Sequence, residues 1–143
     1  MPESSTNRAR IDHLARLGFI LAPMLATIIL QRVYLHAVDP NADLFLLGYN
    51  VHHLFTGVLI EIPAAFVIAF RPHRMLTRRL AEMALGVGSA MVLDEVIYLI
   101  ATDGSNAAYL TAVSLWGAVV LISAAALLLI LLCQAAGRCS LRE

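Results

Sequence analysis

Two pairs of adjacent ionisable residues, His52-His53 and Asp94-Glu95, lie within long apolar stretches of this chain. Imidazole and carboxylate groups are ligands that Zn²⁺, Fe²⁺ and Mn²⁺ accept in proteins. Ionisable groups are costly in hydrocarbon, so those within membrane segments usually face a bundle interior, a partner or a water-filled cavity. We therefore expect the four side chains to form one intramembrane site, with a divalent metal (Zn, Fe or Mn) as its suspected cofactor.

Four further polar residues are placed to contact a substrate or the metal ligands. Arg32 and His36 lie in the preceding apolar stretch, and together they have the chemistry to hold a phosphate or a carboxylate. If the next stretches are helical, Asn50 shares a face with one of the histidines, and Tyr98 lies in line with the two carboxyls. We expect these four side chains to surround the site.

A third carboxyl group, that of Glu61, lies deeper in the stretch that contains the histidines. On a helix it shares a face with Asn50, His53 and Gly57. The glycine is expected to leave room below His53, and chains of Asp, Glu and His mark proton routes through membranes. Glu61 is therefore a candidate proton relay between the site and the interior of the membrane.

The composition places the chain in the membrane class. Hydrophobic residues make up 60% of its 143 residues and the mean hydropathy is +0.80, whereas an ordinary soluble domain is about 45–50% apolar. The length suits a single transmembrane domain, 1–143. Because the formal net charge is zero, no basic field indicates a nucleic-acid partner, and the lipid bilayer is the expected surrounding.

Four stretches are long and apolar enough to cross a bilayer, which takes roughly 20 residues in a helix. Turn-forming sequences such as Asp39-Pro40-Asn41 separate them. Because short loops make consecutive helices antiparallel neighbours, we predict an all-α, integral membrane, up-down four-helix bundle. The expected spans are about 14–38, 46–70, 80–101 and 108–135.

Small residues predict where these helices pack, because backbones in lipid approach closely at such positions. Ala81, Ala84 and Gly88 share one face of the third stretch, and Gly86 lies nearby. The fourth stretch carries no ionisable group before its end. We interpret the third stretch as the one that other helices contact, and the fourth as a scaffold or lipid-facing helix.

The placement of arginine predicts the orientation, because basic loops stay on the cytoplasmic side of a membrane. Arginines lie before the first stretch, between the second and third, and after the fourth, whereas the other two loops contain acidic residues and no base. Arg32 alone breaks this pattern, since it lies inside the first stretch. We expect cytoplasmic N- and C-termini and a multi-pass protein of the cell inner (plasma) membrane.

The imidazoles and the carboxyls are predicted to lie at one depth. At a rise of about 1.5 Å per residue, His52 and His53 lie roughly 9–11 Å below the outer edge of the membrane. Asp94 and Glu95 lie roughly 7–9 Å below the same edge if the core is about 30 Å thick. The site is therefore expected in the outer half of the bundle.

Two classes of function fit such a site. The first is a metal-dependent membrane enzyme, a hydrolase or an oxidoreductase, that acts on a lipid or a small apolar substrate, since a catalytic zinc needs three protein ligands and an open position. The second is a non-enzymatic component. It is either a transport or proton-relay subunit, alone or in a homo-oligomer, or a structural partner of a larger membrane complex. A structural network also stays open, in which Arg32 pairs with Asp94 or Glu95 and holds the bundle together.

Two runs of residues carry a resemblance. The run 49–57 contains the His-His pair followed by an aromatic residue and a glycine, and the run 86–95 is a Gly-x-Gly segment that ends in Leu-Asp-Glu. This combination resembles a pattern in small uncharacterised prokaryotic four-helix integral membrane proteins. The resemblance implies a shared intramembrane site made by His52, His53, Asp94 and Glu95, and it implies no particular reaction.

Overall fold

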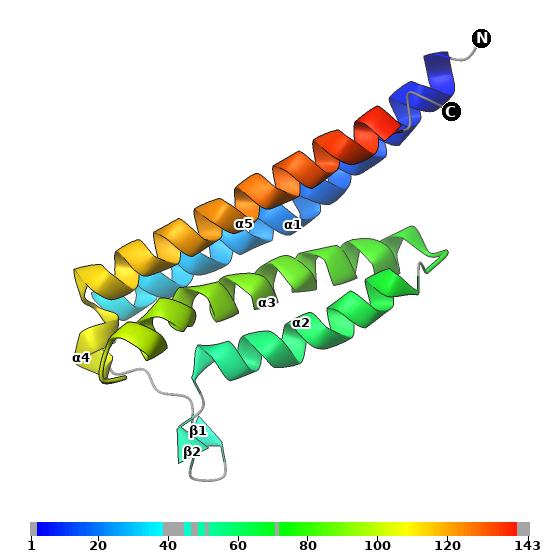
Figure 1. Cartoon of the computed structure of the whole chain (residues 1–143). Helices are drawn as coiled ribbons and strands as arrows, with labels where there is room; N and C mark the ends of the chain where they lie inside the picture. Colours follow the sequence, from blue (N-terminus) through cyan, green and yellow to red (C-terminus); the bar gives the residue numbers. More distant parts are fainter. Residues whose placement is uncertain (1–2, 39–44, 47–48, 51, 71, 140–143) are drawn as a thin grey trace.

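The computed structural model is an α-helical bundle with a small two-stranded hairpin (Figure 1). It describes residues 3–38, 45–46, 49–50, 52–70 and 72–139. The elements are α1 (Glu3–Ala37), β1 (Phe45–Leu46), β2 (Tyr49–Asn50), α2 (His53–Ala69), α3 (Met75–Ala101), α4 (Asn106–Tyr109) and α5 (Ala112–Cys139). Helices α1, α3 and α5 are long and apolar enough to cross a membrane, and α2 is a shorter apolar helix. The predicted α-helical, multi-pass membrane bundle is confirmed at this level.

The second helix is shorter than the hydropathy of its stretch predicts. The expected span starts at about residue 46, whereas α2 begins at His53, after β1 and β2 have paired antiparallel with Phe45 opposite Asn50. A short apolar run can form a strand or a helix, so hydropathy alone does not show where the helix begins. The predicted boundary was wrong, and its correction places both histidines at the start of a helix rather than inside one.

The other helices also begin at residues that differ from the apolar boundaries. Helix α1 begins at Glu3 and α3 at Met75, so each helix extends beyond the apolar part that hydropathy identifies. The fourth stretch is divided into α4 and α5. The side chain of Ser105 caps the start of α4 by accepting a hydrogen bond from the backbone N–H of Ala108.

Helix α3 is the element that the other long helices contact. It packs against α1, α2 and α5, and α1 also packs against α5, whereas α2 packs chiefly against α3 (Figure 1). A Cβ atom on Gly88 would lie 2.7 Å from the carbonyl oxygen of Gly57 in α2. A Cβ atom on Gly86 would collide with the carbonyl oxygen of Ile20 in α1. The small residues of α3 therefore let two backbones approach it, as the sequence predicts.

Large apolar side chains cover the outside of the bundle. Leu59 of α2 is 73% exposed and Val120 of α5 is 63% exposed. The buried apolar core between α1, α3 and α5 is small, and it is formed by Met24, Ala90 and Ile122. Such a surface suits a lipid surrounding, because apolar side chains gain little from burial when the solvent is itself apolar.

Charged side chains link α1 to α3 near the start of both helices. Asp12 of α1 accepts hydrogen bonds from Arg78 at 2.7 Å and from Arg79 at 2.9 Å. Arg79 also donates to Glu82 at 2.7 Å, and Arg16 lies 3.2 Å from Asp12. The start of α1 and the end of α5 lie at this same end of the bundle (Figure 1). That this end faces the cytoplasm stays a prediction from the arginine content.

Candidate functional site

A buried ion pair between Arg32 of α1 and Asp94 of α3 forms the centre of the polar region. The Nε atom of Arg32 donates to Oδ1 of Asp94 at 2.8 Å, and the Nη2 atom lies 2.7 Å from the same oxygen. Asp94 is fully buried and Arg32 is 6% exposed. The predicted pairing of Arg32 with a carboxylate of α3 is therefore confirmed, and Asp94 is the partner.

Tyr109 of α4 closes this ion pair on a second side. Its hydroxyl donates a hydrogen bond to Oδ2 of Asp94, and the guanidinium carbon of Arg32 lies 4.1 Å from the centre of its ring. Burial raises the pKa of Tyr109 well above its ordinary value, and the Asp94 carboxylate raises it further. The phenol therefore stays a proton donor to the carboxylate.

The remaining donors of Arg32 bind the start of α5 and the end of α4. Its Nη1 atom donates to the backbone carbonyl of Tyr109 at 3.0 Å, and its Nη2 atom donates to the hydroxyl of Ser114 at 3.0 Å. One side chain of α1 is thus bonded to α3, α4 and α5. We call the set Gln31, Arg32, Asp94, Tyr109 and Ser114 the Arg32 network. Sequence reasoning missed Gln31, Tyr109 and Ser114, because neither spacing nor hydropathy shows that α4 folds over the end of α1.

Gln31 connects the Arg32 network to His53. Its Nε2 atom lies 2.6 Å from Nδ1 of His53 and 3.4 Å from Oδ2 of Asp94. A hydrogen bond therefore joins the Gln31 amide to the imidazole of His53. Nδ1 of this histidine is engaged within the protein.

Glu95 holds the first turn of α2. Its two carboxylate oxygens accept hydrogen bonds from the backbone N–H groups of His53, at 3.2 Å, and of Leu54, at 2.8 Å. The residue before the helix, His52, makes no side-chain cap of its own. A carboxylate at a helix N-terminus satisfies free N–H groups and complements the positive end of the helix dipole. Glu95 is thus an N-cap that α3 supplies to α2.

Both histidines lie beside Glu95 at distances longer than a hydrogen bond. The Nδ1 atoms of His52 and His53 lie 3.9 Å and 3.8 Å from Oε1 of Glu95. Their side chains keep 31% and 26% of their surface exposed, whereas the Glu95 side chain keeps 5%. The predicted meeting of the imidazoles with a carboxylate of α3 is therefore present, as a loose contact at the edge of the bundle.

Three other predicted contacts have different surroundings. His36 is exposed on the last turn of α1. The Tyr98 hydroxyl donates to the backbone carbonyls of Gly104 and Ser105 in the loop after α3, and the centre of its ring lies 6.3 Å from that of His52. The side chain of Asn50 lies outside the described part of the structure. Tyr98 therefore positions the α3–α4 loop, and its ring packs against Tyr109 at 5.2 Å between centres.

The predicted common layer is confirmed, but its place along α2 is different. Arg32 lies about one and a half turns from the end of α1, and Asp94 lies about two turns from the end of α3. His53 is the first residue of α2, and Ser114 lies in the first turn of α5. Because α2 begins at His53, the expectation that helical residues from about 46 onward precede the histidines was wrong. The layer lies where the ends of the helices meet.

The donors expected to hold a metal are largely engaged with the protein. Among the described residues, no group of three or more His, Cys, Asp or Glu side chains is arranged to hold a metal ion. Asp94 is bound to Arg32 and Tyr109, and Glu95 is bound to two backbone amides. Asp94 does not fit a metal site in this arrangement, because Arg32 already compensates its charge.

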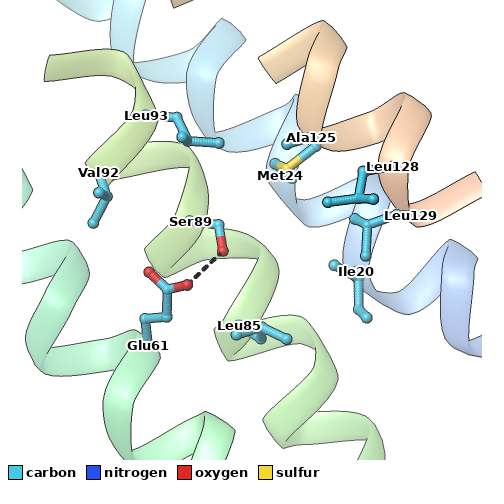
Figure 2. Close-up of a pocket in the computed structure, with 10 residues that line it drawn as sticks. All are labelled: Ile20, Met24, Glu61, Leu85, Ser89, Val92, Leu93, Ala125, Leu128 and Leu129. Carbon is cyan, nitrogen blue, oxygen red and sulfur yellow. Dashed lines mark hydrogen bonds between the residues drawn. The ribbon is translucent and has the colours of Figure 1, made fainter. Parts of the chain in front are cut away.

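The third carboxyl, that of Glu61, has a different surrounding. It lies near the middle of α2, where the Ser89 hydroxyl of α3 donates to its Oε1 atom at 3.1 Å. Both side chains line a cavity of about 280 Å³ that apolar side chains of α1, α3 and α5 complete (Figure 2). Its lining residues are Ile20, Met24, Glu61, Leu85, Ser89, Val92, Leu93, Ala125, Leu128 and Leu129. We call this cavity the Glu61 groove.

The room that Gly57 was expected to leave below His53 is absent, whereas a proton-relay role of Glu61 stays a prediction. A Cβ atom on Gly57 would lie 2.7 Å from the carbonyl oxygen of Gly88 and 2.9 Å from Cβ of Met91. The α3 backbone therefore fills the space that the glycine was expected to leave open. Glycine here permits close helix contact rather than a passage, and Glu61 faces the groove instead.

No family model, no curated protein and no solved structure matches this chain. The resemblance of its second and third stretches to small prokaryotic membrane proteins therefore stays a prediction. What the structure establishes is a multi-pass membrane helical protein with a buried charged network that joins α1, α3, α4 and α5.

Proposed function

We propose that this chain is a non-enzymatic membrane component in which the Arg32 network fixes the ends of the helices and Glu61 is the working group of a ligand-binding or transport site. The observation that carries the proposal is the difference between the carboxyls. Asp94 and Glu95 are engaged by contacts within the protein. In the described part of the chain, Glu61 has one hydrogen-bond donor, Ser89, and it faces a cavity.

The position of Glu61 supports this assignment energetically. A charged carboxylate near the bilayer centre costs at least about 2.5 kcal/mol when no partner compensates it. Among the described residues no arginine or histidine forms an ion pair with Glu61, and its side chain is half-buried rather than sealed in the core. A costly polar group that no internal contact requires indicates a role towards another molecule.

A membrane-permeant carbodiimide, which modifies carboxyl groups that it reaches from the lipid phase, tests this proposal. In detergent-purified protein we expect modification at Glu61 several-fold faster than at Asp94 or Glu95, because Arg32, Tyr109 and two backbone amides cover the latter two. Peptide mass spectrometry locates and counts the modified residues.

Glu61→Gln is the specific variant and Asp103→Asn is the matched control, because Asp103 is an exposed carboxylate in the loop after α3. The first change is expected to abolish the major modified peptide, whereas the second is expected to leave it unchanged. Equal modification of Asp94 and Glu61 would show that the Arg32 network is open, and the distinction between the carboxyls would fail.

A metal site at the two histidines is the second candidate, and one observation favours it. The Nδ1 atoms of His52 and His53 both lie within 4 Å of the same oxygen of Glu95, and the imidazoles are partly exposed. Two histidines and a glutamate are the residue types of the His₂Glu set that holds catalytic zinc. In the described structure these three side chains are not arranged to hold a metal ion, so binding requires Glu95 to release the amides of α2 and His53 to turn away from Gln31. A bound metal would supply an activated water for a hydrolytic reaction on a lipid or small apolar substrate.

Metal content decides between the two candidates. The non-enzymatic proposal expects substoichiometric Zn, Fe and Mn in protein purified without chelator, and a thermal unfolding temperature that EDTA does not change. One equivalent of metal per chain, lost in both His52→Ala and His53→Ala but kept in His36→Ala, would favour the metal site instead. His36 is the matched control because it is an exposed histidine at the same end of the bundle.

Orientation and assembly complete the proposal. The arginine-rich end of the bundle faces the cytoplasm of a plasma membrane, which leaves the Arg32 network in the outer half. Because α2 packs chiefly against α3, its remaining apolar surface is free for lipid, for a second copy or for a larger membrane complex.

A further inference from the structure

We propose that the Glu61 groove binds a lipophilic amine, that is, a single apolar chain that carries a protonated amino group. The inference rests on the proposed function, because it takes Glu61 as a binding group, and it adds the chemical class of the ligand. Three properties of the groove support the inference: its lining, its size, and the Glu61 carboxyl, which forms no ion pair with a described residue.

The lining selects an apolar ligand with one polar end. Eight of the ten lining residues are Ile, Leu, Val, Met or Ala, and the two polar ones, Glu61 and Ser89, lie together on one side (Figure 2). Pockets for small molecules follow this pattern, in which apolar walls bury the body and a few polar groups fix the orientation. A polar ligand such as a sugar or a nucleotide would leave most of its donors without partners here.

The size of the groove selects a narrow ligand. Its volume is about 280 Å³, which is just below the range of roughly 300–1,000 Å³ typical of small-molecule pockets. Leu128 on its rim is 57% exposed, so the groove is partly open at the surface of the bundle. A single aliphatic chain can therefore enter from the apolar phase, whereas a ring system the size of a haem cannot be buried in this space.

The charge selects a cationic head group. Glu61 offers carboxylate oxygens and Ser89 offers a hydroxyl that already donates to one of them. An ammonium group supplies both the compensating charge and hydrogen-bond donors, which makes such contacts shorter and stronger than neutral ones. A bare metal cation is disfavoured, because hard cations take six or more oxygen ligands and the polar side of the groove provides Glu61 and Ser89.

A second copy of the chain does not supply this cation. The chain contains no lysine, and Arg32, the arginine that lies within a membrane-spanning helix away from the arginine-rich end, is buried against Asp94. The other described arginines lie near the starts of α1 and α3 or near the end of α5, whereas Glu61 lies in the middle of α2. Charge complementarity therefore favours a small ligand over an oligomer contact at this groove.

Native mass spectrometry of the protein released from detergent micelles, with dodecylamine as the probe, tests the inference. We expect a one-to-one dodecylamine complex, and at least tenfold less complex with dodecanol, which has the same chain and no charge. Glu61→Gln is expected to lower the bound fraction at least tenfold. Ala125→Leu, which fills the groove and leaves the carboxyl in place, is expected to lower it as well.

Asp103→Asn is again the matched control and is expected to keep full binding. Each variant is first shown to elute as the wild-type protein does on size exclusion, and the carbodiimide experiment is run on the same samples. Dodecylamine that binds Glu61→Gln as well as wild type, or dodecanol that binds equally well, would overturn the inference. If carbodiimide modifies Glu61 rapidly but dodecylamine does not bind, the inference fails and the proposed function stands. If Glu61 is not modified and dodecylamine does not bind, both fail.

Discussion

Replacing Arg32 with methionine is expected to lower the free energy of unfolding by about 3–5 kcal/mol, because it leaves the Asp94 carboxylate buried and uncompensated. The change also removes the hydrogen bonds to the Tyr109 carbonyl and the Ser114 hydroxyl, and the contact between the guanidinium and the Tyr109 ring. Methionine keeps the length and apolar stem of the side chain. Equilibrium unfolding in mixed micelles, followed by circular dichroism, measures the loss.

A double variant separates the charge from the loss of packing. In the double variant Arg32→Met with Asp94→Asn, the amide oxygen still accepts a hydrogen bond from Tyr109 and the uncompensated charge is gone. Its free energy of unfolding should therefore be about 1–3 kcal/mol higher than that of Arg32→Met alone. Arg74→Met is the matched control, since Arg74 is exposed and its replacement should change stability by no more than about 0.5 kcal/mol. If Arg32→Met and Arg74→Met were equally stable, the Arg32 network would not be what holds the helix ends.

Gly86→Ala is expected to lower the free energy of unfolding by about 1–3 kcal/mol, although alanine is the better helix former by about 1 kcal/mol. A Cβ atom at this position collides with the Ile20 carbonyl oxygen, and backbone atoms cannot move aside as a flexible side chain can. Gly88→Ala is expected to have a similar cost, because its Cβ atom would lie 2.7 Å from the Gly57 carbonyl oxygen. The same unfolding experiment measures both.

Gly18→Ala provides the control within the same kind of helix. No atom lies within 4 Å of a Cβ atom built on Gly18, so this change should be neutral or stabilising by up to about 1 kcal/mol. Gly88→Ala has a second expected result, because its Cβ atom would also lie 2.8 Å from Cβ of Glu61. We therefore expect the rate of carbodiimide modification at Glu61 to change in Gly88→Ala and to stay at the wild-type value in Gly18→Ala. Equal stability of Gly86→Ala and Gly18→Ala would contradict the close packing of α1 on α3.

The amino-acid sequence by itself determined the class of protein and much of its polar layer. Hydropathy identified the apolar helices, because a membrane helix must satisfy its backbone internally and present apolar side chains over its whole length. Helical rise placed Arg32, His53 and Asp94 in one layer, and small residues identified the face of α3 that other helices contact. These properties depend on composition and periodicity, which are local.

The tertiary structure alone decided what each polar side chain binds. Sequence spacing gave Asp94 and Glu95 one shared role, whereas the fold turns Asp94 towards Arg32 and Tyr109 and turns Glu95 towards the first amides of α2. Adjacent residues on a helix diverge by about 100°, so which neighbour each meets depends on how α1, α2 and α4 pack around α3. The same holds for Gly57 and Glu61: the backbone of α3 fills the space beside the glycine, and a groove lies beside the glutamate. Contacts between helices are set by three-dimensional packing and not by position along the chain.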